Sequence, residues 1–397
     1  MKFNLIIIAL FSTCYCKVEF SDRARNFSVE LLYYTAEETD WHTVISPFGV
    51  WSLLTGVSIG ATGPSRLQLT NALVIPNNLN TLIKGYKSLT QSVLTAETLD
   101  VEILNKNYLF TDSDFQIQKG FLRSIQSDFD AKLTKLHFDL PEEAAAIANS
   151  VIQKSGATVS NVLRSDDFEN SKMIITNVIS FKGFWRSPFN VTDTRVEVFY
   201  DENKNEVGKV NMMFQQGEFP FSNIRPLKAT ALELPYGDDT NYSFLALLPY
   251  PGAKVADVYR GLESVSLKDI LAQLQSDIKN WGLTDVLVSL PRFKISSNLV
   301  LNRPLNYMGV YDIFDPKKAS FKTITEANNI FVSAIVHKAD IEVTEFGTVA
   351  SASTSAYFAD RILPPSFHAN RPFIYFVIEK TTATIIFSGV YSKPSIF

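Results

Sequence analysis

The sequence predicts an α+β fold in a single domain with large, mostly antiparallel sheets. Apolar residues recur at helical spacing through the first third of the chain, whereas short β-branched and aromatic segments fill the remainder. No tandem repeat, low-complexity tract or Pro/Gly/Ser-rich linker separates these two regions. The chain has 397 residues and 46% hydrophobic content, which is enough to bury one large core.

Four segments carry the helical pattern. Pro47 and the Gly63-Pro64 turn break the pattern among the first three, because both interrupt helices. The last segment opens with a proline and acidic residues and closes at Gly156, the usual signals of a helix start and stop. The predicted helices cover residues 24–38, 46–61, 65–73 and 140–156.

Seven further segments are predicted to be strands because they are short, apolar and bounded by turn residues. The last two adjoin at Thr381-Thr382, which predicts a hairpin. Their nearly continuous apolar character predicts burial on both faces. The strands are residues 173–181, 229–236, 242–249, 285–295, 330–343, 373–380 and 383–391.

The first sixteen residues predict a secretory signal peptide. Lys2 precedes an apolar run from Leu5 to Phe11, and the small residues Cys14 and Cys16 follow it. The alternative is a buried amino-terminal strand or helix, but the order of charge, apolar run and small residues is that of a signal. We therefore expect a signal peptide at 1–16 and one domain at 17–397, in a secreted, extracellular protein.

Composition excludes several classes of function for such a product. Both cysteines of the chain lie in the signal segment, so we expect no thiol nucleophile, thiolate metal site or disulfide in the mature chain. The net charge of −4, which becomes −5 without Lys2, gives no indication of nucleic-acid binding. The lysines of residues 82–89 form no basic stripe for heparin-like polyanions and indicate a solvated helix face.

Three sequons agree with secretion, and each marks a candidate glycosylation site. They are at Asn26, Asn190 and Asn241. Outside the first sixteen residues, no apolar run approaches the length of about 18 residues that a membrane span needs. We expect a soluble monomer.

The sequence offers little for catalysis. Its four histidines show no metal-ligand spacing, and no nucleophile elbow, Walker loop or dinucleotide fingerprint occurs. His337 lies among aliphatic residues and is expected to be a hydrogen-bonded core histidine, while His42 is expected at a surface or helix cap. An extracellular hydrolase stays open as an alternative, since a catalytic triad is assembled only by folding. We expect no enzyme activity, metal or cofactor.

Seven stretches across nearly the whole chain form an ordered pattern. They are residues 45–54, 60–69, 176–189, 232–239, 288–295, 335–348 and 367–390. In their order and spacing they resemble the serpins, which are serine protease inhibitors that trap their targets by a conformational change. The resemblance implies three mostly antiparallel sheets, about eight or nine helices and an exposed reactive-centre loop at about 345–366.

The resemblance also implies roles for individual residues. Trp185 is similar to the tryptophan at the top of the serpin main sheet, where a strand must part from its neighbour. Asn177 and His337, with Ser46, resemble the polar cluster beneath that sheet, in which the Asn and His hydrogen-bond across the gap. Arg292 and Glu345 resemble the ion pair at the base of the loop, although an ordinary surface pair would contribute at most about 1 kcal/mol.

Four residues depart from the family pattern. Gly49 stands where the family usually has Ser, and Ser150 where it usually has Trp, and both differences bear on stability. Phe346 and Val349 stand where acidic residues are typical of the loop hinge, and these bear on the speed of insertion. The hinge implied by the resemblance comprises Glu345, Phe346, Gly347, Thr348, Val349, Ala350 and Ala352.

The residues from 348 onward suit a strand that enters a finished sheet. One face is small, with Thr348, Ala350, Ala352, Thr354 and Ala356, and the other is mostly hydroxylated. Neither proline nor glycine occurs before Pro364-Pro365, so nothing interrupts a ladder. The simpler interpretation is an extended surface loop.

By the family's spacing the cleaved bond is Arg361-Ile362. An arginine fits the buried carboxylate of a trypsin-like specificity pocket, so the expected partner is an Arg-specific serine protease held covalently after loop insertion. Arg followed by Ile is also the bond cleaved in zymogen activation, which suggests a target that activates other proteases in a cascade. The alternative is a non-inhibitory serpin, acting as a carrier or as a plain substrate.

Overall fold

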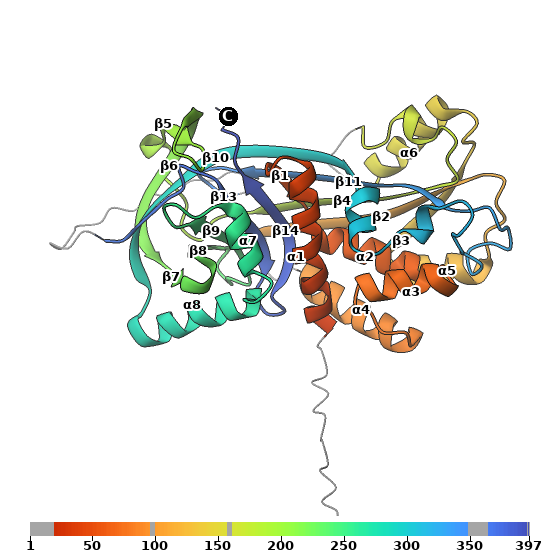
Figure 1. Ribbon diagram of the computed structural model, residues 1–397, viewed down its shortest axis with the longest axis horizontal. Coiled ribbons are helices and arrows are strands. Elements are labelled where there is room, and N and C mark those ends of the chain that lie inside the picture. The colour runs from red at the N-terminus through yellow and green to blue at the C-terminus, as the bar shows by residue number, and fades with distance from the viewer. Residues whose placement is uncertain (1–19, 96–99, 157–160, 348–363, 395, 397) are drawn as a thin grey trace, which may run out of the picture.

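The computed structural model describes residues 20–95, 100–156, 161–347 and 364–394, together with Ile396. Its strands form two sheets (Figure 1). The six-stranded sheet contains, in order, β1 (Thr43–Ile45), β14 (Thr384–Tyr391), β13 (Phe373–Glu379), β9 (Tyr242–Pro249), β8 (Ala229–Tyr236) and β7 (Phe221–Ile224). The eight-stranded sheet contains β3 (Ala131–Leu136), β2 (Val101–Asp112), β4 (Met173–Gly183), β11 (Val332–Val343), β10 (Thr284–Val300), β6 (Glu206–Phe219) and β5 (Arg195–Tyr200), with β12 (Ser366–His368) beside β10.

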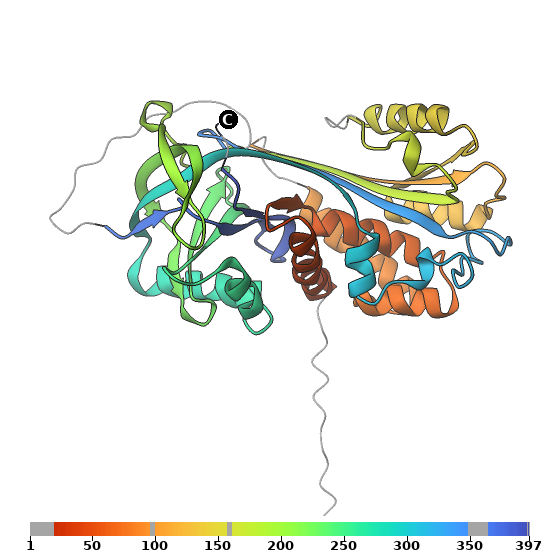
Figure 2. The same cartoon turned by 45° about the horizontal axis from the view of Figure 1, so that its top comes forward.

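The described part of the chain contains nine α-helices, which agrees with the predicted eight or nine. They are α1 (Phe20–Glu38), α2 (Pro47–Ser58), α3 (Gly63–Ala72), α4 (Leu79–Leu94), α5 (Lys119–Phe129), α6 (Pro141–Gln153), α7 (Val255–Gly261), α8 (Leu267–Trp281) and α9 (Asn302–Tyr307). In both views α6 lies on one face of β2, β4 and β11, whereas α2 to α5 cover the other face (Figures 1 and 2). The predicted α+β class is confirmed.

The sheets differ from the expected three because one strand is shared. β10 is a single strand of 17 residues. Its first half pairs with β6, from Thr284 to Arg292, and its second half pairs with β11, from Phe293 to Val300. Figure 2 shows this teal strand passing from one half of the molecule into the other. Two of the expected sheets are therefore joined into one hydrogen-bonded sheet.

The core lies between these layers, and α2 is its central helix. Every residue of α2 is buried, which fits its mostly apolar sequence, and its serine and threonine side chains are hydrogen-bonded. The terminal hairpin is also buried along its length, and Phe373 pairs with Tyr391 while Glu379 pairs with Thr384. This confirms the hairpin predicted at Thr381-Thr382.

Among the described residues, none of the helices is long and apolar enough to cross a membrane. Within the same residues, no group of three or more His, Cys, Asp or Glu side chains is arranged to hold a metal ion.

Candidate functional site

The central feature of the eight-stranded sheet is the seam between β4 and β11, which run parallel to each other. Their ladder extends from Val332 opposite Met173 to Ala339 opposite Ile179. Beyond that point β4 continues to Gly183 along β2, and β11 continues to Val343 along β10. The seam is therefore hydrogen-bonded in its lower part, while at its upper end each strand is paired with its outer neighbour.

Trp185 closes the top of the seam. Its backbone N–H donates to the Phe346 carbonyl at 3.0 Å, and its indole Nε1 donates to the Thr344 carbonyl at 2.9 Å. Its ring stacks on Tyr236 with centroids 4.4 Å apart and an interplanar angle of 13°. These contacts hold the end of β11 against the end of β4, which is the position that the resemblance implied for Trp185.

Gly347 follows in a conformation that only glycine adopts easily. Its φ is +116°, and a Cβ at this position would lie 2.2 Å from the Gly183 carbonyl oxygen and 2.7 Å from the Trp185 nitrogen. Its N–H donates to the Thr344 carbonyl at 3.2 Å, and the Thr344 N–H donates back to the Gly347 carbonyl at 2.9 Å. Thr344 to Gly347 therefore form a tight turn packed directly onto the backbone of β4.

Glu345 is the buried charge of this turn. It is only 2% exposed, and its Oε1 accepts a hydrogen bond from Thr194 Oγ1 at 2.7 Å. Arg292 Nη1 lies 3.6 Å from the same oxygen, so the predicted ion pair is present. The Glu345 carbonyl also accepts from the Phe189 N–H at 2.7 Å. Because one partner is buried, this pair is more than an ordinary surface contact.

His337 lies lower on the seam and is fully buried. Its Nε2 accepts a hydrogen bond from the Ser46 backbone N–H at 2.9 Å, so the ring proton is on Nδ1. Nδ1 is buried, and none of the residues that the structure describes forms a hydrogen bond with it. Burial lowers the pKa of His337 to about 3, which keeps the ring neutral. His337 is thus the core histidine that the sequence predicted.

Ser46 begins α2 and links the seam to the other sheet. Its Oγ accepts from the Gly49 N–H at 3.1 Å, which caps the helix, and donates to the Ile386 carbonyl of β14 at 2.6 Å. The residue is completely buried. Ser46 therefore belongs to the polar cluster beneath the sheet, as expected.

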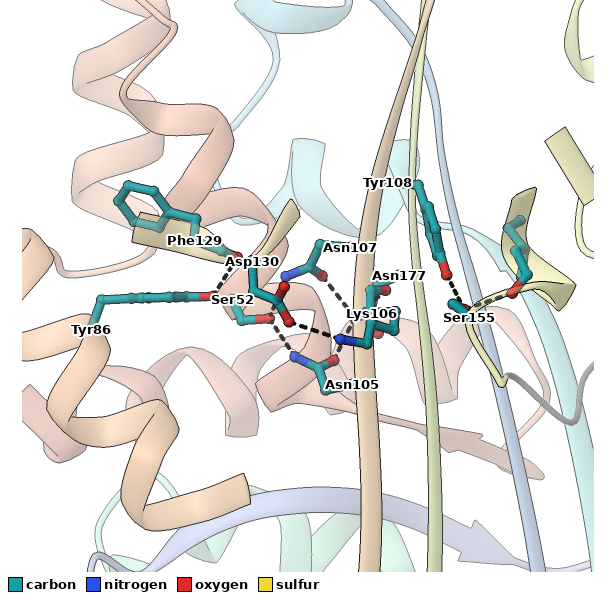
Figure 3. Close-up of polar contacts among 11 residues, drawn as sticks. Ser52, Tyr86, Asn105, Lys106, Asn107, Tyr108, Phe129, Asp130, Ser155 and Asn177 are labelled. Atoms are coloured by element: carbon teal, nitrogen blue, oxygen red, sulfur yellow. Dashed lines mark hydrogen bonds and ion pairs between the residues drawn. The ribbon is translucent and has the colours of Figure 1, made fainter. Parts of the chain in front are cut away.

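Asn177 is held from the side of β2 (Figure 3). Its Nδ2 donates to Asn105 Oδ1 at 2.7 Å and to Asn107 Oδ1 at 2.9 Å. The Nδ2 atoms of both those residues donate to Ser52 Oγ at 3.2 Å. The side chain thereby joins β4, β2 and α2 into one network.

The expected hydrogen bond between Asn177 and His337 is absent from the described structure, so that prediction was wrong. The two residues are paired in register. Asn177 Oδ1, however, is buried without a partner and sits where a side chain at position 49 would be, because a Cβ on Gly49 would lie 2.2 Å from it. With glycine at this position, Asn177 turns toward β2 and α2 and away from His337.

Asn105, Asn107 and Ser52 were missed by the sequence analysis. A signal was available: Asn105 and Asn107 are two positions apart in an apolar segment, which places two amides on one face of a strand. A separate contact, between Tyr108 and Ser155, lies on the opposite face of β2 (Figure 3).

Several predicted residues lie outside the described part of the chain. They are Thr348, Val349, Ala350 and Ala352 of the hinge and Arg361 and Ile362 of the cleaved bond. The segment that contains them is bounded on one side by Gly347 against β4 and on the other by β12, which pairs parallel to Leu287–Ser289 of β10.

The glycosylation candidates differ in exposure. Asn26 is exposed on α1, whereas Asn190 and Asn241 are half-buried. Asn190 Oδ1 accepts from the Thr192 N–H at 3.1 Å, and Asn241 Nδ2 donates to Asp239 Oδ2 at 3.3 Å.

The other three histidines, His42, His137 and His368, each have a hydrogen-bond partner in the fold. His42 is half-buried, and its Nδ1 accepts from the backbone N–H groups of Ser392 and Lys393, which follow β14, so the predicted helix-capping role was wrong. Burial lowers the pKa of His42. His137 bonds to Ser113, and His368 bonds to Glu197 at 3.0 Å. Among the described residues, no hydrogen-bonded series joins a serine, a histidine and a carboxylate.

Comparison with known proteins agrees with this geometry. A sequence model described as "Serpin (serine protease inhibitor)" matches residues 22–394. The chain is 32% identical over 377 residues to leukocyte elastase inhibitor of Bos taurus, covering 93% of this chain and 97% of that protein. It is 29% identical over 381 residues to Serpin B9 of Homo sapiens, covering 94% and 99%.

Solved structures share the fold. The crystal structure of human thyroxine-binding globulin superimposes with a TM-score of 0.81 at 23% identity, and the match covers 95% of this chain and 99% of that one. At that identity the likeness shows the fold alone. The family match spans nearly the whole chain, and we conclude that the protein belongs to the serpin family of serine protease inhibitors and is not an enzyme.

Proposed function

We propose that this serpin is a secreted inhibitor of trypsin-like, Arg-specific serine proteases. In the proposed mechanism it acts as a suicide substrate: the target cleaves Arg361-Ile362, an acyl-enzyme forms, and residues 348 onward insert into the seam between β4 and β11 before water releases the enzyme. The observation that carries the mechanism is the parallel seam, which ends at a glycine turn.

The direction of the strands supports insertion. A strand that entered the seam after a reversal at Gly347 would run antiparallel to β11, and because β4 is parallel to β11, it would be antiparallel to β4 as well. Insertion would replace one parallel ladder by two antiparallel ladders. Two ladders contain more hydrogen bonds than one, and antiparallel pairing is slightly more stable per residue than parallel pairing. This difference favours the inserted state.

The choice of target rests on Arg361. Glu345 is fixed beside Arg292 at the base of the loop, and the family's spacing from Glu345 leads to Arg361. Some relatives are named for elastase, but an arginine side chain is long and charged and meets its best partner in a pocket with a buried carboxylate. We therefore favour trypsin-like enzymes over elastase for this chain.

The experiment is incubation of the full chain with trypsin, elastase and chymotrypsin in parallel. We expect an SDS-stable complex with trypsin, and a released carboxyl-terminal fragment that begins at Ile362. Arg361→Ala should transfer complex formation from trypsin to elastase, and Ala352→Pro should yield cleavage without complex because proline cannot donate to the ladder. Complex formation with elastase alone would contradict the specificity.

A non-inhibitory role is the second candidate, and the hinge favours it. Trp185, Thr194 and Phe189 all bond to residues 344–346, and those bonds constrain the turn from which a strand would have to insert. Melting temperature distinguishes the two: an inhibitory chain cleaved in the loop should unfold well above the intact chain, whereas a non-inserting chain should not.

Secretion is tested separately. Expressed in animal cells, the protein should appear in the medium with Lys17 as its first residue, and a glycosidase should reduce its apparent mass. Retention of residues 1–16 in a cytosolic product would exclude this part of the proposal, without bearing on inhibition.

A further inference from the structure

A cavity of about 330 Å³ lies among three turns, and none of its lining residues belongs to the seam or to the residues of the proposed inhibitory mechanism. Residues 200–204 follow β5, residues 249–253 follow β9, and residues 370–372 connect β12 to β13. The Tyr200 N–H donates to the Asn370 carbonyl at 2.9 Å, which joins the first turn to the third. Two tyrosines and three prolines contribute rings to the lining: Tyr200, Tyr250, Pro249, Pro251 and Pro372.

Arg371 brings a positive charge into this cavity without a counter-ion. Its Nη2 donates to the Pro249 carbonyl at 2.7 Å and its Nη1 to the His368 carbonyl at 3.5 Å. Its Nε is buried without a partner, and no carboxylate in the described part of the chain forms an ion pair with it. Half-buried charges are normally paired, so an uncompensated guanidinium is notable. Burial lowers the pKa of Arg371, yet a guanidinium stays charged at physiological pH.

The two carboxylates that line the cavity are engaged elsewhere. Asp201 Oδ1 accepts from the N–H groups of Asn203 and Asn205, and its Oδ2 accepts from Asn205 Nδ2. These bonds lower the pKa of Asp201. Glu202 Oε1 accepts from the Val255 N–H at 2.7 Å. Asp201 therefore stabilises its own turn, whereas Glu202 holds the first residue of α7, and neither carboxylate forms an ion pair with Arg371 among the described residues.

Lys204 adds a second cation to the lining. It is exposed and forms no ion pair among the described residues. On Arg371, one N–H of Nη1 and one of Nη2 remain after the two carbonyl contacts, and this fork matches the two oxygens of a carboxylate. Positive charge and ring-lined walls thus meet in one small space.

We propose that this cavity binds a small aromatic carboxylate, with the carboxylate at Arg371 and Lys204 and the ring against Tyr200 and Tyr250. The volume lies at the lower end of the range for small-molecule sites, about 300–1,000 Å³, and suits a single ring with its acid group. None of the lining residues belongs to the seam or to the proposed cleaved bond, so the proposal stands whether or not the protein inhibits a protease.

Benzoate is the probe, and calorimetric titration of the full chain at constant ionic strength is the measurement. Benzamide has the same shape without the charge, and acetate has the charge without the ring. We expect benzoate to bind at least about tenfold more tightly than either, because each lacks one of the two recognised features. Saturating benzoate should also raise the melting temperature, since it binds the folded chain.

Variants locate the binding. Lys204→Ala should weaken benzoate binding about threefold, as expected for an exposed charge. Tyr200→Ala should lower the affinity for benzoate toward that for acetate, because the ring contact is lost. Arg371→Lys keeps the charge but loses the fork and should weaken binding about tenfold. Since Arg371 also holds two turns together, Lys204→Ala and Tyr200→Ala test the site even if that variant fails to fold. Lys209→Ala, an exposed lysine on β6 outside the lining, is the matched control.

Three results would overturn the proposal. The first is benzoate binding no tighter than acetate and benzamide. The second is binding that neither Lys204→Ala nor Tyr200→Ala changes, which would place it elsewhere. The third is a loss of benzoate affinity in Lys209→Ala equal to that in Lys204→Ala, which would show that the protein's overall charge, and not this cavity, determines binding.

Discussion

His337 and Asn177 are opposite each other across the β4–β11 seam, yet each is hydrogen-bonded only on its own side. His337 Nε2 accepts from the Ser46 N–H, and Asn177 Nδ2 donates to Asn105 and Asn107. This leaves two buried atoms at the seam, His337 Nδ1 and Asn177 Oδ1, without partners. Each such atom destabilises the closed sheet by about 1–3 kcal/mol, so a rearrangement that satisfies them is favoured.

The buried neutral His337 predicts a loss of stability in acid. Its pKa is about 3 in the folded chain, against about 6.5 for an unfolded histidine. Below pH about 6.5 the unfolded chain therefore binds a proton that the folded chain does not, and the free energy of unfolding falls by about 1.4 kcal/mol per pH unit toward pH about 3. This stability is fully present above pH about 6.5.

The comparison is His337→Gln, whose carboxamide oxygen can still accept from the Ser46 N–H. Urea unfolding at about pH 7.5 and about pH 5 should show the wild type losing about 2 kcal/mol more than the variant over this interval. Carboxylates titrate equally in both proteins and cancel. Identical pH dependence in the two proteins would mean that His337 is protonated in the fold.

Gly49 and Asn177 are predicted to be strongly coupled. Gly49→Ala places a Cβ 2.2 Å from Asn177 Oδ1, and the buried Asn177 can move only by releasing Asn105 and Asn107. We expect a loss of about 1–3 kcal/mol, most of which should disappear when Asn177→Ala is already present.

A double-mutant cycle by urea unfolding measures this coupling. Gly120→Ala is the control, because Gly120 lies in α5 and a Cβ there meets nothing within 4 Å. Additive losses for Gly49→Ala and Asn177→Ala would show that the glycine has no steric role.

The sequence correctly predicted features that depend on residues close to one another in the chain. The hairpin of β13 and β14, the helix begun by Ser46 and Pro47, and the buried His337 each follow from nearby residues, through apolar run, capping chemistry and strand context. Family spacing added the Arg292–Glu345 pair, which joins residues far apart in the chain.

The parts that sequence did not predict depend on tertiary contacts. The amides of Asn105 and Asn107 become a network only because α2 brings Ser52 beneath β2. The prediction ended a strand at Ile295, but β10 continues to Val300 because β11 pairs with its second half. The turn of Asn177 away from His337 likewise depends on a glycine that lies on another element.

Gly347 is predicted to tolerate no side chain. Its positive φ alone makes alanine unfavourable by about 1 kcal/mol, and the Cβ would also meet backbone atoms of Gly183 and Trp185, which cannot move aside as a side chain could. Gly347→Ala should therefore lose about 1–3 kcal/mol beyond the conformational term and should displace Trp185 from Tyr236.

Gly309→Ala is the control that measures the cost of the positive φ alone. Gly309 has a φ of +85°, and an added Cβ would meet nothing within 4 Å, so its loss of unfolding free energy contains no steric contribution. Urea unfolding followed by tryptophan fluorescence reports both stability and the surroundings of Trp185. Equal losses in the two variants would show that the hinge does not pack on β4 in solution.

Two ion pairs involve β10: Lys294 pairs with Glu342 of β11, and Arg292 pairs with Glu345 in the turn that follows β11. We expect burial to influence their strength more than distance does. Lys294 Nζ lies 2.9 Å from Glu342 Oε2, but the two side chains are 50% and 35% exposed. Arg292 Nη1 lies farther from Glu345 Oε1, at 3.6 Å, but the Glu345 side chain is only 3% exposed. Solvent screens the first pair on both sides and the second mainly on the Arg292 side.

Double-mutant cycles with Arg292→Met and Glu345→Gln, and with Lys294→Met and Glu342→Gln, measure the two couplings. We expect about 1–2 kcal/mol for Arg292–Glu345 and about 0.5 kcal/mol or less for Lys294–Glu342, with the latter falling further at high salt. Glu345→Gln can keep the hydrogen bond from Thr194, so the cycle reports the charge interaction. A stronger coupling for Lys294–Glu342 than for Arg292–Glu345 would contradict this expectation. It would mean that water reaches the Glu345 carboxylate at the top of the seam and screens its interaction with Arg292.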